Sequence, residues 1–257
     1  MRRAVVLLAG MAITLLLTSG IAVAIINGQP DGKVHPYVGM IYNNEVVCSG
    51  TLISPTVVLT AGHCTEFFEQ GDSQIYVTFE PEAAFNPGDA YAGTAHTHPD
   101  FCLGCAPGLS RFDRFDAGVV VLDRPVENIR YGKLPEASLV NTLDKGQRLT
   151  TVGYGVRDFQ IGGGPLRPTD IATRYRATVR IFNSNNVMGD TFVKHSGGSA
   201  GRGGEGTCSG DSGGPHFLPD QRTVVAITAF GNSLCTGPGY AQRVDLPRVL
   251  RFINQVL

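Results

Sequence analysis

From residue 25 onward, short apolar runs alternate with turn-forming residues along the whole chain. The runs are rich in β-branched and aromatic residues, and they read YVGMIYN, TVVLTA, QIYVTF, AGVVVL, RLTTVGYG, YRATVRIF and TVVAITAF. Runs of this length bounded by Gly, Pro, Asn and Asp are typical of β-strands, and many of them at short spacing favour a sandwich or a barrel. The pattern therefore predicts an all-β protein.

The C-terminal segment has a different period. In LPRVLRFINQVL the apolar residues recur every three or four positions, at Leu246, Val249, Leu250, Ile253 and Leu257. This spacing places them on one face of an α-helix. We expect a terminal helix packed on the β-structure through that face. The Gly-rich segments 158–170 and 195–206 are expected to be surface loops.

The N-terminus has the layout of a secretory signal peptide. Two arginines precede an apolar run from Ala4 to Leu17, and the sequence AVA at 22–24 provides the small residues of a cleavage site. We expect residues 1–24 to be removed and the protein to be secreted. An uncleaved membrane anchor is the alternative, because apolar residues resume before Ile26, but the polar break TSG favours cleavage.

Composition excludes some classes of partner. Of the 257 residues, 42% are hydrophobic and 17% are charged, and the formal net charge is −1. The chain can therefore bury a sizeable core. Its near-neutral charge gives no electrostatic reason to expect nucleic acid or an anionic membrane surface as a partner. We expect neither of these partners once the signal peptide is removed, and we expect a monomer.

The segment GDSGGP, residues 210–215, carries the strongest chemical signal. Glycines around Ser212 let a substrate carbonyl approach the backbone, and N–H groups there can converge on an oxyanion. The pattern G-x-S-x-G also fits the nucleophile elbow of an α/β-hydrolase, in which the acid and the histidine follow the serine. Here His63, in LTAGHC, and Asp116, in DAGVVVL, both precede Ser212. The order His, Asp, Ser disfavours the hydrolase elbow.

With these motifs the sequence resembles the chymotrypsin/trypsin family of serine peptidases over essentially everything after residue 24. Five segments match in the family's order: IING, CSGTLISPTVVLTAGHC, DAGVVVL, TVGYG and CSGDSGGP. The resemblance implies two antiparallel six-stranded β-barrels and a C-terminal helix, with the active site between the barrels. We expect one peptidase domain over 25–257, with the barrel boundary near 130–145.

The resemblance also implies a division of catalytic roles. Ser212 is expected to attack the scissile carbonyl, His63 to carry the proton, and Asp116 to hold the imidazole tautomer. Asp113 is the alternative acid, but Asp116 stands directly before the apolar run, as the family has it. The N–H groups of Gly210 and Ser212 are expected to form the oxyanion hole. No cofactor or metal is expected.

A further role falls on the start of the matching region. In the family, a cut before an Ile-Val-like pair frees an α-amino group, which folds inward and pairs with the acid just before the nucleophile. In this chain those partners are Ile25 and Asp211. A buried ion pair of this kind can switch a loop between two states. Because AVA directly precedes Ile25, we expect export and activation to be one cleavage.

The resemblance locates the substrate pocket as well. In the family, the residue six before the nucleophile lies on the pocket floor, and an Asp there selects Lys or Arg. That position is Gly206, and the other expected substrate-binding residues are Thr207, Ala229, Phe230, Gly231 and Gly239. The sequence therefore predicts cleavage after an uncharged, apolar side chain. Glu205 would serve as the acid only if the loop were shifted in register.

One departure from the family concerns the surroundings of the catalytic acid. The family's Ser-Trp-Gly segment reads Ala229-Phe230-Gly231, so the usual serine hydroxyl near the acid is missing unless Thr228 takes its place.

Six cysteines in an exported chain predict disulfides, although they allow 15 pairings. The family pattern pairs Cys48 with Cys64 and Cys208 with Cys235, which leaves Cys102 with Cys105.

The segment HTHPDFCLGC raises the alternative that Cys102 and Cys105 bind a metal ion. His96, His98, Cys102 and Cys105 have the ligand types of a zinc site, but a local disulfide is favoured in an exported protein. The remaining histidines lie outside any motif and are expected at the surface: His35, His195 and His216.

The sequence predicts a secreted serine endopeptidase acting on a protein or peptide substrate. The alternatives are an inactive binding protein on a peptidase fold, a hydrolase of small esters, and a zinc-dependent hydrolase. Retention of serine, histidine and aspartate together favours the peptidase.

Overall fold

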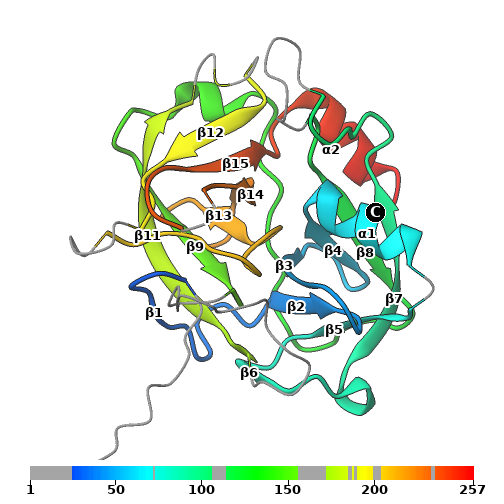
Figure 1. The fold of residues 1–257 in the computed structure, drawn as a ribbon. Helices are drawn as coiled ribbons and strands as arrows, with labels where there is room; N and C mark the ends of the chain where they lie inside the picture. The colour runs from blue at the N-terminus through cyan, green and yellow to red at the C-terminus, as the bar shows by residue number, and fades with distance from the viewer. Residues whose placement is uncertain are drawn as a thin grey trace, which may run out of the picture.

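The structure is a computed structural model that describes residues 25–71, 73–105, 114–155, 172–184, 187, 190–198, 204–232 and 235–257. Several features of the sequence lie outside the described residues: the expected signal peptide, Asp113, the loop 158–170 and part of the loop 195–206. The ribbon in Figure 1 shows two groups of strands side by side, with the C-terminal helix at the edge of one of them.

The first group is a closed antiparallel barrel. Its strands are hydrogen-bonded in the order β2-β3-β4-β8-β7-β5, and β5 pairs with β2 to close the ring. They are β2 (Val38–Tyr42), β3 (Val47–Leu52), β4 (Val57–Thr60), β5 (Ile75–Thr78), β7 (Tyr91–Thr97) and β8 (Gly118–Leu122). The neighbours β4 and β8 are almost wholly buried, which is why they read as continuous apolar runs.

The second group closes in the same way. Pairing of β11 with β9 completes the ring β11-β12-β15-β14-β13-β9, and all of these pairs are antiparallel. The strands are β9 (Arg148–Gly153), β11 (Tyr175–Asn183), β12 (Phe192–His195), β13 (Pro215–Phe217), β14 (Val224–Phe230) and β15 (Gly239–Arg243). The expectation of two six-stranded antiparallel barrels is thus confirmed.

Small elements join the barrels to each other. Strand β1 (Gln29–Pro30) is added to β11, and β6 (Glu82–Ala83) pairs with β10 (Ala172–Thr173). Between β8 and β9 the chain passes from the first barrel to the second and includes the 3-10 helix η2 (Leu139–Thr142). Another 3-10 helix, η1 (Pro87–Asp89), precedes β7. The boundary near 130–145 remains a prediction within this connection.

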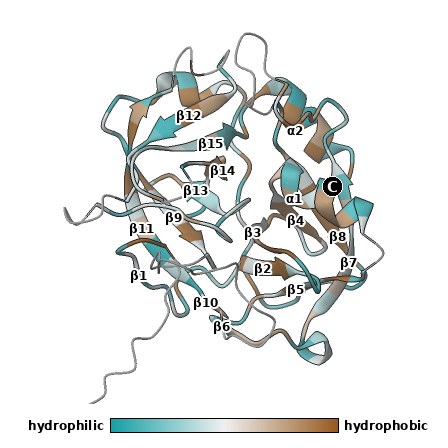
Figure 2. Ribbon diagram, in the orientation of Figure 1, coloured by the Kyte–Doolittle hydropathy of each residue, from teal (hydrophilic) through white to brown (hydrophobic). Residues whose placement is uncertain are grey.

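Two α-helices complete the described fold: α1 (Gly62–Gln70) and α2 (Pro247–Asn254). The expected terminal helix is α2, and its residues Val249, Phe252 and Ile253 are buried in a hydrophobic core that is formed mainly by the first barrel. Figure 2 shows the corresponding mixture of hydrophobic and hydrophilic colour on this helix. Leu257 is 56% exposed, so the helical face ends before it. Among the described residues, no helix has the length and apolar character needed to cross a membrane.

A buried ionic cluster fastens the segment after Ile25 to both barrels. Arg174 is almost completely buried, and its Nε lies 3.0 Å from Asp31 Oδ2. The same guanidinium donates to the carbonyl oxygens of Val38 and Phe79 in the first barrel, both at 2.9 Å. His35 also contacts Asp31, with Nδ1 2.6 Å from Oδ1, and it is buried rather than at the surface as predicted.

Removing the Arg174 guanidinium leaves the buried Asp31 carboxylate without its buried arginine partner. We expect Arg174→Met to lower the free energy of unfolding by about 3–5 kcal/mol in urea titrations. Arg176→Ala is the matched control, because Arg176 also reaches Asp31 but is 27% exposed, and its loss should cost about 1 kcal/mol or less. Equal losses in the two variants would contradict the role assigned to Arg174.

Candidate active site

His63 and Asp116 meet at one edge of the first barrel. Helix α1 begins where β4 ends, and Asp116 comes just before β8, the antiparallel neighbour of β4. His63 Nδ1 lies 2.9 Å and 3.1 Å from the two carboxylate oxygens, and the His63 backbone N–H donates to Oδ1 at 2.8 Å. Asp116 is fully buried, whereas the His63 side chain is 16% exposed. The carboxylate therefore fixes the proton on Nδ1 and leaves the lone pair on Nε2.

Ser212 belongs to the second barrel but is anchored to the first. Its carbonyl oxygen accepts the N–H of Ser49 on β3 at 2.8 Å and lies 3.9 Å from Sγ of Cys64, the neighbour of His63 in the chain. The loop 208–214 around it leads directly into β13. The structure thus brings Ser212 to the junction of the barrels, beside the segment that carries His63.

The backbone of this loop leaves two donors available. The N–H groups of Asp211, Gly213 and Gly214 donate to carbonyl oxygens. Those of Gly210 and Ser212 have no acceptor in the part of the chain that the structure describes. Gly210 and Gly213 have φ angles of 92° and 77°, a region that favours glycine. The alternating pattern presents two N–H groups that a ligand oxygen can accept.

Ser49 is a site residue that sequence reasoning missed. Its buried hydroxyl donates to the carbonyl oxygen of Gly210 at 2.9 Å and accepts the N–H of Tyr154 at 3.0 Å. One hydroxyl therefore joins β3, the end of β9 and the loop before Ser212. The only sequence signal was a small polar residue within a strand that is otherwise buried.

The surroundings of Asp116 differ from the expectation. In the described chain the Thr228 hydroxyl makes no hydrogen bond to Asp116, and it lies 3.1 Å from Nε2 of His216. Gln242, on β15, accepts the N–H of Asp116 through its side-chain oxygen at 2.9 Å. Its amide nitrogen donates to the carbonyl oxygens of Thr191 and Arg243. Gln242 therefore ties the Asp116 backbone to the second barrel, a role that sequence reasoning missed.

Asp211 is fully buried next to Ser212. Its Oδ1 accepts the N–H of Gly155 and its Oδ2 accepts the N–H of Cys208, both at 2.8 Å. Burial raises the pKa of Asp211 to about 7, and these two hydrogen bonds only partly offset that effect. No cation among the described residues pairs with this carboxylate.

Ile25 lies in the same neighbourhood. Its fully buried side chain packs with Tyr175, whose partner on β9 is Gly153, and the Asp211 carboxylate lies directly against Gly153. The φ angle of Ile25 is 58°, a left-handed conformation that is strained for a β-branched residue. In the uncut chain its nitrogen is a neutral peptide nitrogen and supplies no charge to Asp211.

A cavity of about 210 Å³ opens beside Ser212. Five of the six expected substrate-binding residues line it: Thr207, Ala229, Phe230, Gly231 and Gly239. Gly206 is not among the residues that line it. Its backbone pairs with Ile26, and a Cβ atom there would lie 2.2 Å from the nitrogen of Gly198. Position 206 therefore has no room for a side chain.

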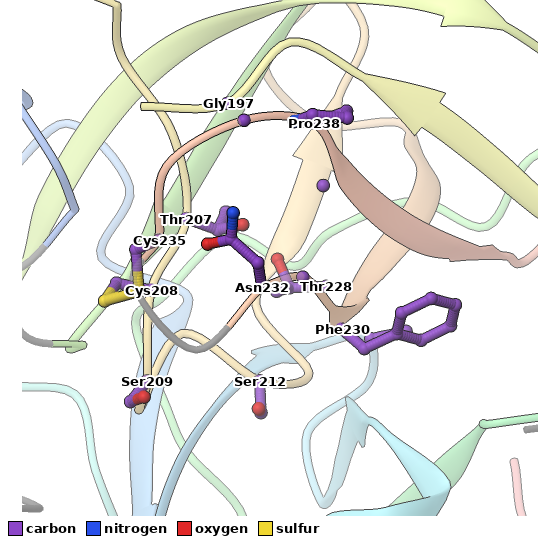
Figure 3. A pocket seen from close by; sticks show the side chains of 14 residues that line it. Gly197, Thr207, Cys208, Ser209, Ser212, Thr228, Phe230, Asn232, Cys235 and Pro238 are labelled. Atoms are coloured by element: carbon purple, nitrogen blue, oxygen red, sulfur yellow. A yellow bond between two sulfur atoms is a disulfide. The ribbon is translucent and has the colours of Figure 1, made fainter. Parts of the chain in front are cut away.

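The cavity wall is uncharged and partly polar. Among the described residues, its lining includes no charged side chain, and the Glu205 carboxylate instead accepts the N–H of Thr178. Figure 3 shows Thr207, Asn232 and Thr228 near one another on one side of the cavity, while the ring of Phe230 points away from them. Thr207 was expected on this wall from the sequence, whereas the Thr228 hydroxyl and the Asn232 amide were not.

The three disulfides join the residues expected from the family pattern, so the predicted bonds are confirmed: Cys48–Cys64, Cys102–Cys105 and Cys208–Cys235. The last of these forms part of the cavity wall (Figure 3).

The zinc alternative loses its thiolates, because Cys102 and Cys105 are bonded to each other. His98 is buried, with its ring 5.0 Å from that of Phe115, and its Nδ1 accepts the N–H of Asp100 at 3.0 Å. His195 and His216, expected at the surface, are fully buried.

Comparisons with known proteins point to trypsins. Residues 25–253 match the family model described as Trypsin. The chain is 28% identical over 199 residues to a trypsin of Phaedon cochleariae, covering 75% of this chain and 71% of that protein. It is 27% identical over 224 residues to a trypsin of Saccharopolyspora erythraea, covering 82% and 88%.

A solved structure described as HL collagenase has a similar fold. The TM-score is 0.66 at 20% sequence identity, and the match covers 90% of this chain and 98% of the other.

The raised pKa of Asp211 predicts a pH-dependent stability in an uncut chain that keeps the residues before Ile25. The folded state binds a proton more tightly than the unfolded state, so this contribution is present below pH 4 and is lost as pH rises towards 7. Urea titrations from pH 4 to pH 7.5 should therefore show a decline in the free energy of unfolding that Asp211→Asn removes. If the free energy of unfolding changes with pH in the same way in the uncut protein and in Asp211→Asn, Asp211 is not the titrating group.

Proposed function

Because this chain belongs to the trypsin family of serine peptidases, we propose that it is a secreted endopeptidase that cleaves protein or peptide substrates. The peptide bond is hydrolysed through a triad of Ser212, His63 and Asp116. The observation that carries the proposal is the buried Asp116 carboxylate on His63 Nδ1, at the barrel junction where Ser212 is also anchored.

The chemistry proceeds in two steps. Ser212 Oγ attacks the scissile carbonyl carbon while His63 Nε2 takes the hydroxyl proton, and the oxyanion accepts the N–H groups of Gly210 and Ser212. His63 then gives the proton to the leaving amine, and the acyl group remains on Ser212. Water releases the acyl group by the same sequence, and the serine is restored. Asp116 remains ionised and stabilises the imidazolium.

The cavity beside Ser212 is proposed to hold the substrate side chain that precedes the cut. Since no described residue of its lining is a carboxylate, Lys and Arg side chains find no counter-ion on the described wall. The proposed specificity is therefore for an uncharged side chain. The sequence favoured an apolar side chain, but the cavity wall also carries the hydroxyl groups of Thr207 and Thr228.

Activation is proposed to depend on the removal of residues 1–24. The cut before Ile25 would create an α-ammonium group in the neighbourhood of a buried carboxylate that has no cation among the described residues. It would also release Ile25 from its left-handed conformation, because the first residue of a chain has no preceding carbonyl to clash with. Both effects favour an ion pair between Ile25 and Asp211 in the cut chain.

Reactivity of Ser212 towards a fluorophosphonate probe tests the triad. The cut protein should be labelled at Ser212, and Ser212→Ala should not be labelled. Asp116→Asn should slow labelling about a thousandfold or more, because the asparagine favours the wrong tautomer of His63. Asp123→Asn is the control, since Asp123 is exposed at the opposite end of β8 and should label normally. A folded, cut protein that is not labelled at Ser212 contradicts the peptidase, whereas turnover of esters without peptides supports the ester-hydrolase alternative.

The N-terminal sequence of the secreted protein tests the coupling of export and activation. It should begin IINGQ, and a form that retains residues before Ile25 should label at least a hundredfold more slowly with the same probe. Asp211→Ala should be slow in the cut form as well, while the exposed-loop variant Glu136→Ala should not be affected. A different mature terminus, with full activity, would refute the coupling and leave the triad proposal intact.

A further inference from the structure

Two buried histidines lie behind the cavity and take no part in the proposed chemistry. His195, on β12, and His216, on β13, are fully buried, with ring centroids 4.6 Å apart. His195 is the β-sheet partner of Gly239, and a Cβ atom on Gly239 would lie 2.8 Å from its Nε2. His216 contacts Thr228. Gly239 and Thr228 both line the cavity. Gly239 therefore lies between the cavity and the His195 ring, and Thr228 lies between the cavity and the His216 ring.

The tautomer of His195 follows from its contacts. Nδ1 lies 2.7 Å from the carbonyl oxygen of Ser196, which can only accept, so Nδ1 carries the hydrogen. Nε2 is therefore an acceptor, and it has no donor among the described residues.

The tautomer of His216 follows from comparing a hydrogen on Nδ1 with a hydrogen on Nε2. Nε2 lies 3.1 Å from Thr228 Oγ1, whereas Nδ1 is buried with no partner in the described chain. If Nε2 accepted from Thr228, Nδ1 would be a buried N–H without an acceptor, which is rarer in proteins than an unpaired acceptor. The favoured arrangement has the hydrogen on Nε2, which donates to Thr228 Oγ1.

This arrangement determines the direction of the Thr228 hydroxyl. A hydroxyl has one hydrogen to donate, and with Oγ1 accepting from His216 that hydrogen is available to another group. No described protein group accepts it, and Thr228 lines the cavity beside Asn232 (Figure 3). The wall therefore presents an oriented donor to whatever side chain enters.

We propose that Thr228, oriented by the buried His216–His195 pair, is a specificity-determining residue that donates its hydroxyl hydrogen to a carbonyl oxygen at the end of the substrate side chain. The inference rests on the proposed peptidase function, and it replaces the broader uncharged specificity with a side chain that ends in a carboxamide or a carboxylate. His216 and His195 act through Thr228 and are positioning residues.

The protonation state of His195 and His216 distinguishes a carboxamide substrate from a carboxylate substrate. Burial lowers the pKa of His195 to about 4, and burial together with His195 lowers the pKa of His216 well below its ordinary value. Both rings are thus neutral at neutral pH. A carboxamide binds without a change in proton count, whereas a carboxylate favours the uptake of a proton by one of the two acceptor nitrogens.

Other charged groups on the neighbouring strands do not supply this proton or its counter-charge. Arg148 and Arg180 are exposed, Lys194 lies over the ring of Tyr240, and Arg243 is paired with Asp245. Glu205 is held by the N–H of Thr178.

Matched peptides that differ only in the residue before the cut test the proposal. The series is Leu, Gln, Glu and Lys, measured with the cut protein at concentrations set by active-site titration. We expect kcat/KM for Gln or Glu to exceed that for Leu at least tenfold. Thr228→Val should lower that ratio about tenfold, and Thr228→Ser, which keeps the hydroxyl, should restore it. If Glu is the preferred residue, its kcat/KM should rise relative to Gln as pH falls from 8 to 5.

A wild-type preference for Leu, or a ratio that Thr228→Val leaves unchanged, overturns the proposal. A second readout does not depend on turnover and uses the Ser212→Ala protein. Nitrogen-15 NMR of the imidazoles should show His195 protonated at Nδ1 and His216 at Nε2. Protonation of His216 at Nδ1 overturns the proposal even if no peptide is cleaved, whereas the expected tautomers in a protein that no probe labels would locate the failure in the peptidase function.

Discussion

The carboxylate of Asp211 is the constraint on which the arrangement around Ser212 depends. It is buried directly against the backbone of the second barrel, and a Cβ atom on Gly153 or Gly155 would lie 2.3 Å or 2.6 Å from its atoms. Two backbone N–H groups partly stabilise its charge, but no cation among the described residues does. An isolated buried carboxylate is costly, so this loop is stable in its present form only when Asp211 is protonated or gains a cation.

The site is assembled from both barrels, so its geometry depends on how they are joined. His63 and Asp116 come from the first barrel and Ser212 from the second. Single polar side chains fix the junction at several points: Ser49 links β3 to the carbonyl of Gly210, and Gln242 links β15 to the backbone of Asp116. Each is buried and makes more than one hydrogen bond, so each position admits few substitutes.

The sequence predicted most of what depends on local pattern. The strands followed from apolar runs between turn residues, and α2 followed from its 3.6-residue period until Leu257, where the chain leaves the core. The resemblance supplied the barrel architecture and the disulfide pairs. These features were predictable because short segments determine them, or because a motif specifies the partner.

Features that depend on distant partners were missed. His35, His195 and His216 were expected at the surface, because no local pattern reveals a buried histidine whose hydrogen-bond partner is remote, as Gln221 is for His35 and Thr228 for His216. Gly206 was assigned to the cavity by its offset from Ser212, and no local pattern reveals that Gly198 approaches it closely enough to leave no room for a side chain. Thr228 was considered only as a substitute for the missing serine near Asp116, whereas its hydroxyl lies against His216 and the residue lines the cavity.

The central claim is that the charge of Asp211 is balanced only after the chain is cut before Ile25. Carbon-13 NMR of the Asp211 carboxyl, recorded against pH in the uncut and cut proteins, measures this directly. The account predicts a pKa of about 7 in the uncut chain and a pKa below the ordinary value for aspartate, about 3.9, after the cut. An identical pKa in the two forms would contradict it.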